Sequence, residues 1–266
     1  MADESQLSPF TFPLQGGLVL DQSPFSMQPG MALELENFEP SVTGGYRRIN
    51  GFSKYVTAIV PQTSASTEDV LMVTSFAGKV MAARGEKIFS ADVGGSSWTE
   101  RDNGRSNAKR YTFEKFNFDG NDKIIVADQA NAPTVFNTSF AATDVTSAGT
   151  GEVSTAVTGA KFVVAFKDHM FYAGMASTPQ EIVFSEPFDE DDFDTSDGAG
   201  SIKVDDDITG LKVFRDGLFI FCESRIFQLT GTSSSNFAIT PITRNIGCVN
   251  GFTIQEFAGD LIFLSK

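Results

Sequence analysis

The chain has 266 residues, a formal net charge of −14, and 26 phenylalanines against four tyrosines and one tryptophan. This length allows one large all-β domain or two ordinary domains, with a core large enough to be stable without disulfides. The acidic charge argues against a protein that wraps nucleic acid, which requires clustered Lys and Arg, and it also suits high solubility.

The two cysteines, Cys222 and Cys248, are interpreted as reduced core thiols. Cys222 lies within an apolar run, where a free thiol packs like a small hydrophobic side chain. A disulfide between them is the less favoured alternative, and free thiols indicate synthesis in a reducing compartment. Residues 1–10 have neither a basic start nor an apolar run, so we expect no signal peptide.

Residues 1–45 are predicted to form an extended arm, because they hold four prolines in the first thirty residues and show no apolar period. After Pro29-Gly30, the sequence MALELEN is rich in helix formers and predicts a short helix over Met31–Asn37. We expect the arm to pack on the following domain or on a neighbouring subunit, with a disordered leader as the alternative.

Residues 46–266 contain a repeat of short apolar runs. A phenylalanine ends a run at positions 76, 118, 166, 214 and 257, with spacings of 42, 48, 48 and 43 residues. In four of these five units an apolar residue follows four positions later, across a short break (Val80, Met170, Leu218 and Leu261). In the four complete units a pair of apolar residues begins the predicted third strand (Ile88-Phe89, Val135-Phe136, Val183-Phe184 and Ile226-Phe227).

The fourth unit shows the pattern most clearly. Its predicted strands are Leu211–Phe214, Leu218–Glu223, Ile226–Thr230 and Phe237–Ile242. An Asp-Gly pair between apolar runs, here Asp216-Gly217, is a strong hairpin signal because these residues supply positive φ angles.

A period of 40–50 residues with four strands per unit is typical of a β-propeller. The sequence therefore predicts an all-β fold, a β-propeller of four-stranded antiparallel blades over residues 46–266 with an extended N-terminal arm over residues 1–45. An irregular antiparallel sandwich is the alternative. The count is about four full blades plus a partial fifth, which stops after its second strand. We expect this to be the front part of a longer chain; alternatively, Tyr46–Val60, with a hairpin signal at Asn50-Gly51, supplies the missing strands.

Motifs for catalysis are sparse. The single histidine, His169, falls in a predicted hairpin turn, where we expect it to be exposed, and one histidine excludes any site that needs two. The lone Gly-x-Gly within Ser147–Ala160 lacks the strand-to-helix context of a phosphate loop and is interpreted as an inter-blade loop. The sequence assigns no catalytic, cofactor-binding or metal-binding residue, so we expect no cofactor and no enzymatic activity.

The segment FSADVGGSSWTE, residues 89–100, resembles the Asp-box of sialidase-type propellers. Ser90, Asp92, Gly94 and Trp98 fit that motif, with one extra residue between Gly94 and Trp98. Because an Asp-box is a structural turn between the last two strands of a blade, the resemblance supports the fold and not an activity.

The segment Glu186–Asp207 is rich in aspartate. Calcium at Asp189–Asp207 is one interpretation, because hard cations bind clustered carboxylates. The EF-hand pattern fails from Asp192, since its sixth position is Asp197 and its twelfth is Lys203. A solvated loop or an acidic interaction surface is the favoured interpretation.

Short motifs near the N-terminus resemble those of phage tail structural proteins. They are Gly16-Gly17, Pro29-Gly30, Ala32 with Asn37-Phe38, and Gly45 to Gly51 with Arg48. The segments IVFSEPFDEDDF and GLKVFRDGLFIFCESRIFQLTG are similar to the propeller part of the tail-tube (nozzle) and tail-hub proteins of short-tailed phages and their relatives.

This resemblance implies a virion structural protein that forms a homo-oligomeric ring around the DNA channel of a phage tail. Its partners would be further copies of itself and neighbouring tail proteins, with DNA only in passage and no membrane. It would be synthesised in the host cytoplasm and located in the virion. The alternatives are a propeller module that binds host-surface glycan and, less favoured, a glycosidase on the same fold.

Overall fold

A computed structural model describes residues 16–41, 43–63, 68–146, 153 and 156–265. The chain divides into two compact units, Met1–Lys54 and Tyr55–Lys266. No helix among the described residues has the length and apolar character needed to cross a membrane.

The first unit is built around a small antiparallel hairpin. It contains a 3₁₀ helix, η1 (Pro24–Ser26), and the strands β1 (Phe38–Pro40) and β2 (Tyr46–Arg48), which pair with each other. The Tyr46 hydroxyl donates to the carbonyl oxygens of Gly17 at 2.9 Å and Gly30 at 3.1 Å, so it ties the hairpin to the preceding loop.

Three expectations for this region are wrong. Met31–Asn37 is not helical, because the Ala32 amide donates to the Gly17 carbonyl and Leu18 forms a parallel bridge with Ala32. Asn50-Gly51 forms no hairpin; the hairpin turn lies between Pro40 and Tyr46 instead. The alternative in which Tyr46–Val60 supplies strands to the last sheet is also wrong for Tyr46–Arg48, because β2 pairs with β1.

The second unit consists of antiparallel sheets in which sequential strands pair in order. Sheet 1 is β3 (Val70–Phe76), β4 (Lys79–Arg84), β5 (Lys87–Asp92) and β6 (Thr99–Asn103). Sheet 2 is β7 (Thr112–Phe116), β8 (Lys123–Ala127), β9 (Thr134–Asn137) and β10 (Ala142–Asp144). Sheet 3 is β11 (Phe162–Phe166), β12 (His169–Ala173), β13 (Glu181–Phe184) and β14 (Gly200–Lys203).

Sheet 4 is β15 (Ile208–Phe214), β16 (Gly217–Cys222), β17 (Ile226–Thr230) and β18 (Ala238–Thr243). A short helix, η2 (Gly251–Thr253), leads to sheet 5, which has two strands in the described part of the chain, β19 (Gln255–Phe257) and β20 (Asp260–Ile262).

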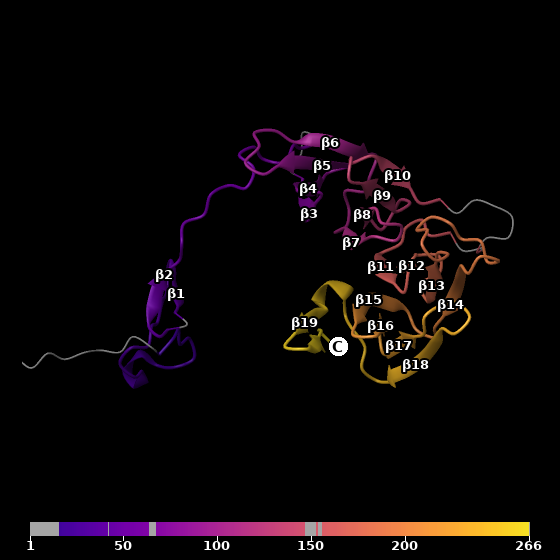
Figure 1. Ribbon diagram of the computed structural model, residues 1–266. Helices are drawn as coiled ribbons and strands as arrows, with labels where there is room; N and C mark the ends of the chain where they lie inside the picture. Colours follow the sequence, from indigo (N-terminus) through magenta and orange to yellow (C-terminus); the bar gives the residue numbers. More distant parts are fainter. Residues whose placement is uncertain (1–15, 42, 64–67, 147–152, 154–155, 266) are drawn as a thin grey trace, which may run out of the picture. The chain divides into compact units, whose positions relative to one another are not determined.

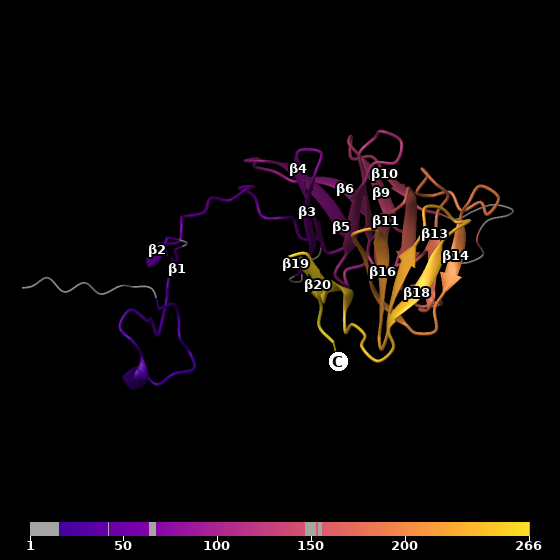
Figure 2. The same ribbon diagram turned by 60° about the horizontal axis from the view of Figure 1, so that its bottom comes forward.

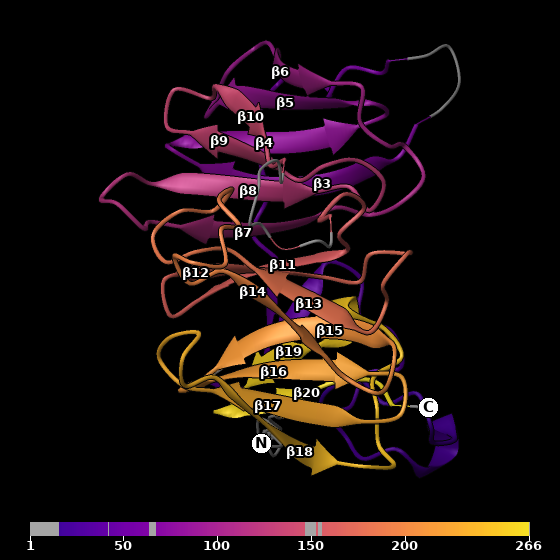
Figure 3. The same ribbon diagram turned by 90° about the vertical axis from the view of Figure 1, so that its right-hand side faces the viewer.

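The sheets stand side by side, with their first strands toward a common centre (Figure 1). Figure 2 shows the same sheets tilted forward, and Figure 3 shows them following one another from sheet 1 to sheet 4. The all-β class and the four-stranded antiparallel sheets are confirmed, and the arrangement is propeller-like.

Apolar side chains fill the space between neighbouring sheets. Met81 and Ile88 of sheet 1 belong to one buried cluster with Ile124 and Phe136 of sheet 2. Equivalent clusters join sheets 2 and 3, sheets 3 and 4, and sheet 4 with sheet 5. A middle strand such as β12 is buried along its whole length, which explains why its apolar residues do not alternate with polar ones.

A hairpin joins the first two strands of each sheet, as predicted, but two details of the prediction are wrong. Phe76, Phe166, Phe214 and Phe257 each pair with the residue three positions later, across a two-residue turn. In sheet 2 the equivalent residue is Phe116, which pairs with Lys123, and not the predicted Phe118.

The second correction concerns the fourth unit, where the positive φ of +52° belongs to Arg215, while Gly217 lies in β16. Gly217 is needed for space, because a Cβ there would lie 2.4 Å from the Gln228 side chain on β17.

The reason for this glycine is testable with a second substitution. Gly217→Ala should lower the free energy of unfolding by about 1–3 kcal/mol through overpacking, and adding Gln228→Ala should recover most of that loss. Gly78→Ala is the matched control: Gly78 has a φ of +76° with no atom near its Cβ position, so its loss should persist in the Gln228→Ala background. Denaturant unfolding measures the parent chain, the three single variants and the two double variants, and equal losses in both backgrounds would contradict the packing explanation.

Candidate functional site

The second unit has a central cavity of about 1060 Å³ that is open to solvent. Its walls are the first strands of sheets 1 to 4, namely β3, β7, β11 and β15, together with η2 and the start of β19 (Figure 1). Each of these first strands is the edge strand of its sheet. The cavity is therefore bordered by strand edges, which have backbone donors and acceptors on one side.

Glu114, in the middle of β7, is the most perturbed acid of this cavity. Burial raises its pKa to about 7, while the backbone amide of Ala165 and the positive charge of Lys212 both lower it. Ala165 belongs to β11 and Lys212 to β15, so this carboxyl of sheet 2 interacts with sheets 3 and 4. A carboxyl whose pKa is near neutrality can exchange a proton at physiological pH.

Other contacts at the cavity wall are structural. The Thr112 hydroxyl donates to the Lys161 carbonyl at 2.7 Å, which joins sheets 2 and 3 at their inner edge. The Arg110 guanidinium lies 4.6 Å from the centre of the Phe252 ring, which joins sheet 2 to η2. The wall thus mixes both charges with exposed apolar side chains, of which Val73 is 62% exposed.

Sequence reasoning assigned no site residue and did not find Glu114. The run TFEKF reads as an ordinary alternating strand, with Glu114 and Lys115 as polar positions. Nothing in this short pattern signals that the innermost strand of one sheet lies against the innermost strand of the next.

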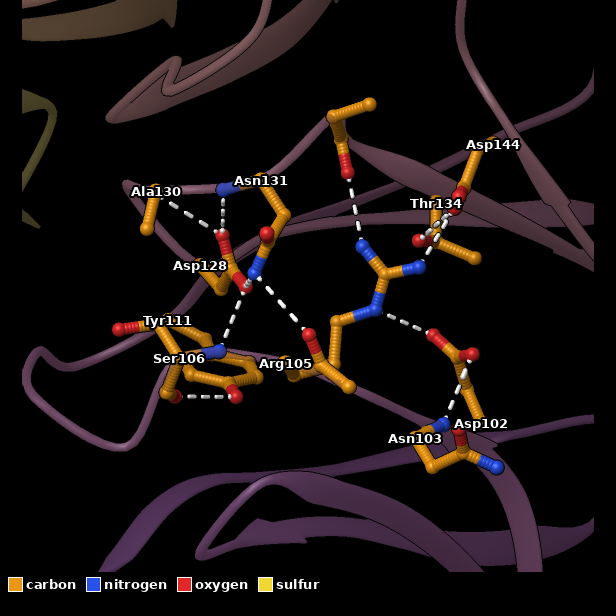
Figure 4. A network of polar contacts seen from close by, with 12 residues as sticks. Asp102, Asn103, Arg105, Ser106, Tyr111, Asp128, Ala130, Asn131, Thr134 and Asp144 are labelled. Atoms are coloured by element: carbon orange, nitrogen blue, oxygen red, sulfur yellow. Dashed lines mark hydrogen bonds and ion pairs between the residues drawn. The ribbon is translucent and has the colours of Figure 1, made fainter.

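A polar network locks sheet 1 to sheet 2 (Figure 4). Arg105 follows β6, and its guanidinium group is almost fully buried. It donates to Asp102 at 2.5 Å, to Asp144 at the end of β10 at 2.5 Å, and to the Ala132 carbonyl at 2.8 Å. The Thr134 hydroxyl donates to the same Asp144 oxygen at 2.8 Å, so this oxygen accepts two hydrogen bonds.

The same network holds the segment that connects the two sheets. Asp128 accepts from the backbone amides of Ser106, Ala130 and Asn131, at 2.8, 3.0 and 2.7 Å, and from the Asn131 side chain. Burial opposes ionisation of Asp128, but these donors outweigh it and lower its pKa. The network has a structural explanation for each of its charges, so we assign it to fold assembly and not to catalysis.

The expectation for His169 is wrong. It is the first residue of β12 and is 1% exposed, with Nδ1 at 2.6 Å from the Ser185 carbonyl oxygen. Its ring packs edge-on against Phe184 and Phe237, and burial lowers its pKa. The turn occupies Lys167 and Asp168 alone, which moves His169 into the sheet.

The Asp-box segment does form the hairpin between β5 and β6, the last two strands of sheet 1. The Trp98 indole donates to the Ala58 carbonyl at 3.0 Å, and the Gly94 amide donates to the Tyr55 carbonyl at 2.7 Å. The Thr57 amide donates to Gly95 at 3.0 Å. This turn therefore anchors the start of the second unit, Tyr55–Ala58, on sheet 1.

The acidic segment uses several of its carboxylates as acceptors for nearby amides. Asp192 accepts from the Asp194 amide at 2.9 Å, and Asp194 accepts from the Ser196 amide at 2.8 Å. Glu190 binds Lys123 of β8 at 2.8 Å, which ties the segment to sheet 2. Within the described residues, no three His, Cys, Asp or Glu side chains form a group suited to a metal ion. In the Gly-rich stretch Ser147–Ala160, residues 147–152 and 154–155 lie outside the described residues.

Both cysteines are free and buried, as expected. Burial raises the pKa of the Cys222 thiol to about 12, so it is inert at neutral pH.

Sheet 5 presents an uncovered apolar face. Leu261 and Phe263 pack with the buried cluster of sheet 4, where the Phe263 ring lies 5.2 Å from Phe221. The neighbouring positions are exposed: Phe257 by 67%, Ile262 by 52% and Leu264 by 58%. Gln255 pairs with Ile262 and Asp260 with Phe257, so these exposed apolar side chains share their face of the sheet with polar residues.

No model of a known protein family matches the chain, and no curated protein matches it. Among solved structures it is similar to BBS1N in complex with ARL6DN, with 10% identity, a TM-score of 0.44, and coverage of 66% of this chain and 53% of that chain. It is also similar to the extracellular domain of the putative hybrid two component system BT3049 from B. thetaiotaomicron, with 11% identity, a TM-score of 0.49, and coverage of 74% and 27%.

The corresponding domain of BT4673 from the same organism has 12% identity, a TM-score of 0.46, and coverage of 73% and 25%. The chain thus spans about half of BBS1N and about a quarter of each extracellular domain. These similarities carry no conclusion about function.

The Arg105 network predicts a large effect of one substitution. Arg105→Ala should lower the free energy of unfolding by about 3 kcal/mol, because it leaves Asp102 and Asp144 without their shared cation. Lys87→Ala, which breaks the half-exposed Lys87–Glu100 pair between β5 and β6, should cost less than about 1 kcal/mol. Denaturant unfolding compares the two, and similar losses would contradict the assigned role.

Glu114 predicts a pH dependence of stability. Its pKa of about 7 in the folded chain exceeds the ordinary value of 4.5, so between these values the folded chain binds a proton that the unfolded chain releases. The free energy of unfolding should therefore fall as the pH rises through this window.

Urea unfolding between pH 4.5 and 8 measures this slope. Glu114→Gln should flatten it, whereas Lys212→Met should extend it to higher pH, because the Lys212 charge lowers the Glu114 pKa. An unchanged slope in Glu114→Gln would assign the dependence to other groups.

Proposed function

We propose that the chain is a structural subunit of a phage tail, in which it forms a homo-oligomeric ring around the DNA channel at the nozzle, tube or hub. The observation that carries the proposal is the propeller-like arrangement of the sheets, in which the first strands of sheets 1 to 4 line one central cavity. In the assembled particle the sheets close into a β-propeller with its N-terminal arm.

The charge of the chain supports this role. A net charge of −14 repels the phosphate backbone, so DNA passes the ring without being held by it. The short motifs at Gly16-Gly17, Pro29-Gly30 and Gly45 to Gly51, which resemble those of tail proteins, support it from the sequence. Copies of the chain bind one another in the ring, and the ring contacts the adjacent tail proteins. The protein acts without catalysis, as part of the virion.

Particles released by the host that carries this gene test the proposal. Antibodies against residues 55–265 should label one end of the tail in negative-stain electron microscopy, and the chain should copurify with particles through a density gradient. The antibodies could instead label only free protein or the host surface. If the chain then also binds or hydrolyses members of a glycan panel, the glycan-recognising alternative is favoured over this function.

A further inference from the structure

The wall of the central cavity carries exposed apolar side chains on the side of sheets 1 and 2 (Figure 1). Val70 and Val73 of β3 are 46% and 62% exposed, and Phe113 of β7 is 38% exposed. All three belong to the lining of the cavity. A hollow of this size that combines apolar side chains with a few polar groups is typical of sites for small molecules.

The same wall holds two cations without a carboxylate partner. Neither Lys212 of β15 nor Arg110, two residues before β7, takes part in an ion pair among the described residues. The chain as a whole has a net charge of −14, so acidic side chains are abundant elsewhere on it. Two cations that remain without such partners in one cavity favour an anionic ligand.

The acids of the lining oppose these cations only in part. Asp69 is exposed and directly precedes β3, where solvent screens its charge. Glu114 has a pKa of about 7, so about half of the chains carry it protonated at neutral pH. The described residues of β11, η2 and β19 add no charged side chain to the lining, and burial raises the pKa of Tyr111, which keeps its hydroxyl neutral. The charge in the middle of the cavity is therefore set by Glu114 and Lys212.

These two groups lie on different sheets and leave room between them. The Lys212 charge acts on the Glu114 carboxyl, yet the two side chains form no ion pair. When Glu114 is protonated, its carboxyl donates a hydrogen bond instead of repelling an anion, and the Lys212 charge is unopposed. An ammonium group and a neutral carboxyl that face one space are both hydrogen-bond donors to an acid group.

We propose that the central cavity binds a small organic anion with an apolar body, such as a medium-chain carboxylate. Its acid head accepts hydrogen bonds from Lys212 and from protonated Glu114, and its apolar body lies along β3 and β7, at Val73 and Phe113. Arg110 adds a second positive charge to the wall. This binding requires the second unit alone and is independent of the ring in the proposed function.

Calorimetric titration of the full chain with decanoate tests the site at pH 6, where Glu114 is mostly protonated. The parent chain should bind decanoate. Decyltrimethylammonium has the same apolar body with a cationic head, and it should bind at least about tenfold more weakly, because it meets Lys212 with a like charge. This comparison uses the parent chain, so it does not depend on the folding of any variant.

The pH dependence identifies the role of Glu114. Because its pKa is about 7, its protonated fraction falls about tenfold between pH 6 and pH 8, and the affinity for decanoate should fall by up to the same factor. Decanoate itself stays ionised over this range, as an ordinary carboxyl does. Glu114→Gln should bind equally at both pH values, because an amide donates a hydrogen bond without titrating.

Proton uptake gives an independent readout. At pH 7.5 the parent chain should take up most of one proton for each decanoate bound, and Glu114→Gln should take up none. Titrations in two buffers of different ionisation enthalpy measure this number.

Two pairs of variants locate the ligand. Lys212→Met should weaken decanoate binding about tenfold. Lys115→Met makes the same charge change at an exposed residue beside Glu114 that is outside the lining, and it should bind like the parent chain. Val73→Asp should remove binding, whereas Val93→Asp, at a valine of the β5–β6 turn that is 59% exposed, should not. Circular dichroism checks that each variant is folded.

Four results would overturn the inference: no binding of decanoate to the parent chain at pH 6, equal affinity for decyltrimethylammonium, equal weakening by Lys212→Met and Lys115→Met, or binding at pH 7.5 without proton uptake. Antibody labelling of tails is decided separately. Labelled tails without decanoate binding would leave the proposed function intact, and binding without labelled tails would leave the site intact.

Discussion

A sheet of four short strands has two apolar faces in this chain, and neither can be buried without a neighbouring sheet. The burial pattern of the strands in the second unit follows from this requirement. The middle strands, such as β12 and β16, are largely buried, while most positions of the outer strands β6, β10 and β18 are exposed. Stability therefore lies in the contacts between sheets more than within any one of them.

Polar groups act at the places where this packing alone does not fix one sheet against the next. The buried Arg105 joins the end of sheet 1 to the last strand of sheet 2 through two carboxylates. Glu114 does so at the cavity edge, where it interacts with β11 and β15. Arg105 positions sheet 1 against sheet 2 because its hydrogen-bond partners are few and directional.

The last sheet meets this requirement on one face only. Sheet 5 buries Leu261 and Phe263 against sheet 4, but its other face has no neighbour among the described residues. The β1–β2 hairpin has the opposite deficit, since it offers strands and apolar side chains without a core.

The all-β class and the strand order were determined by the sequence, since the recurring phenylalanine, the two-residue turns and the Ile-Phe or Val-Phe pairs are local signals of strands and hairpins. The Asp-box turn was predictable for the same reason.

Other features depended on contacts between residues far apart in sequence. His169 is buried because a two-residue turn shifts it into a strand that sheet 4 covers, and Gly217 is required by Gln228 on the neighbouring strand β17. Met31–Asn37 is not helical because Gly17 and Leu18 compete for its backbone, and Glu114 became a candidate because three innermost strands meet around it. Local propensity sets the elements, but burial and charge pairing arise only once the sheets face one another.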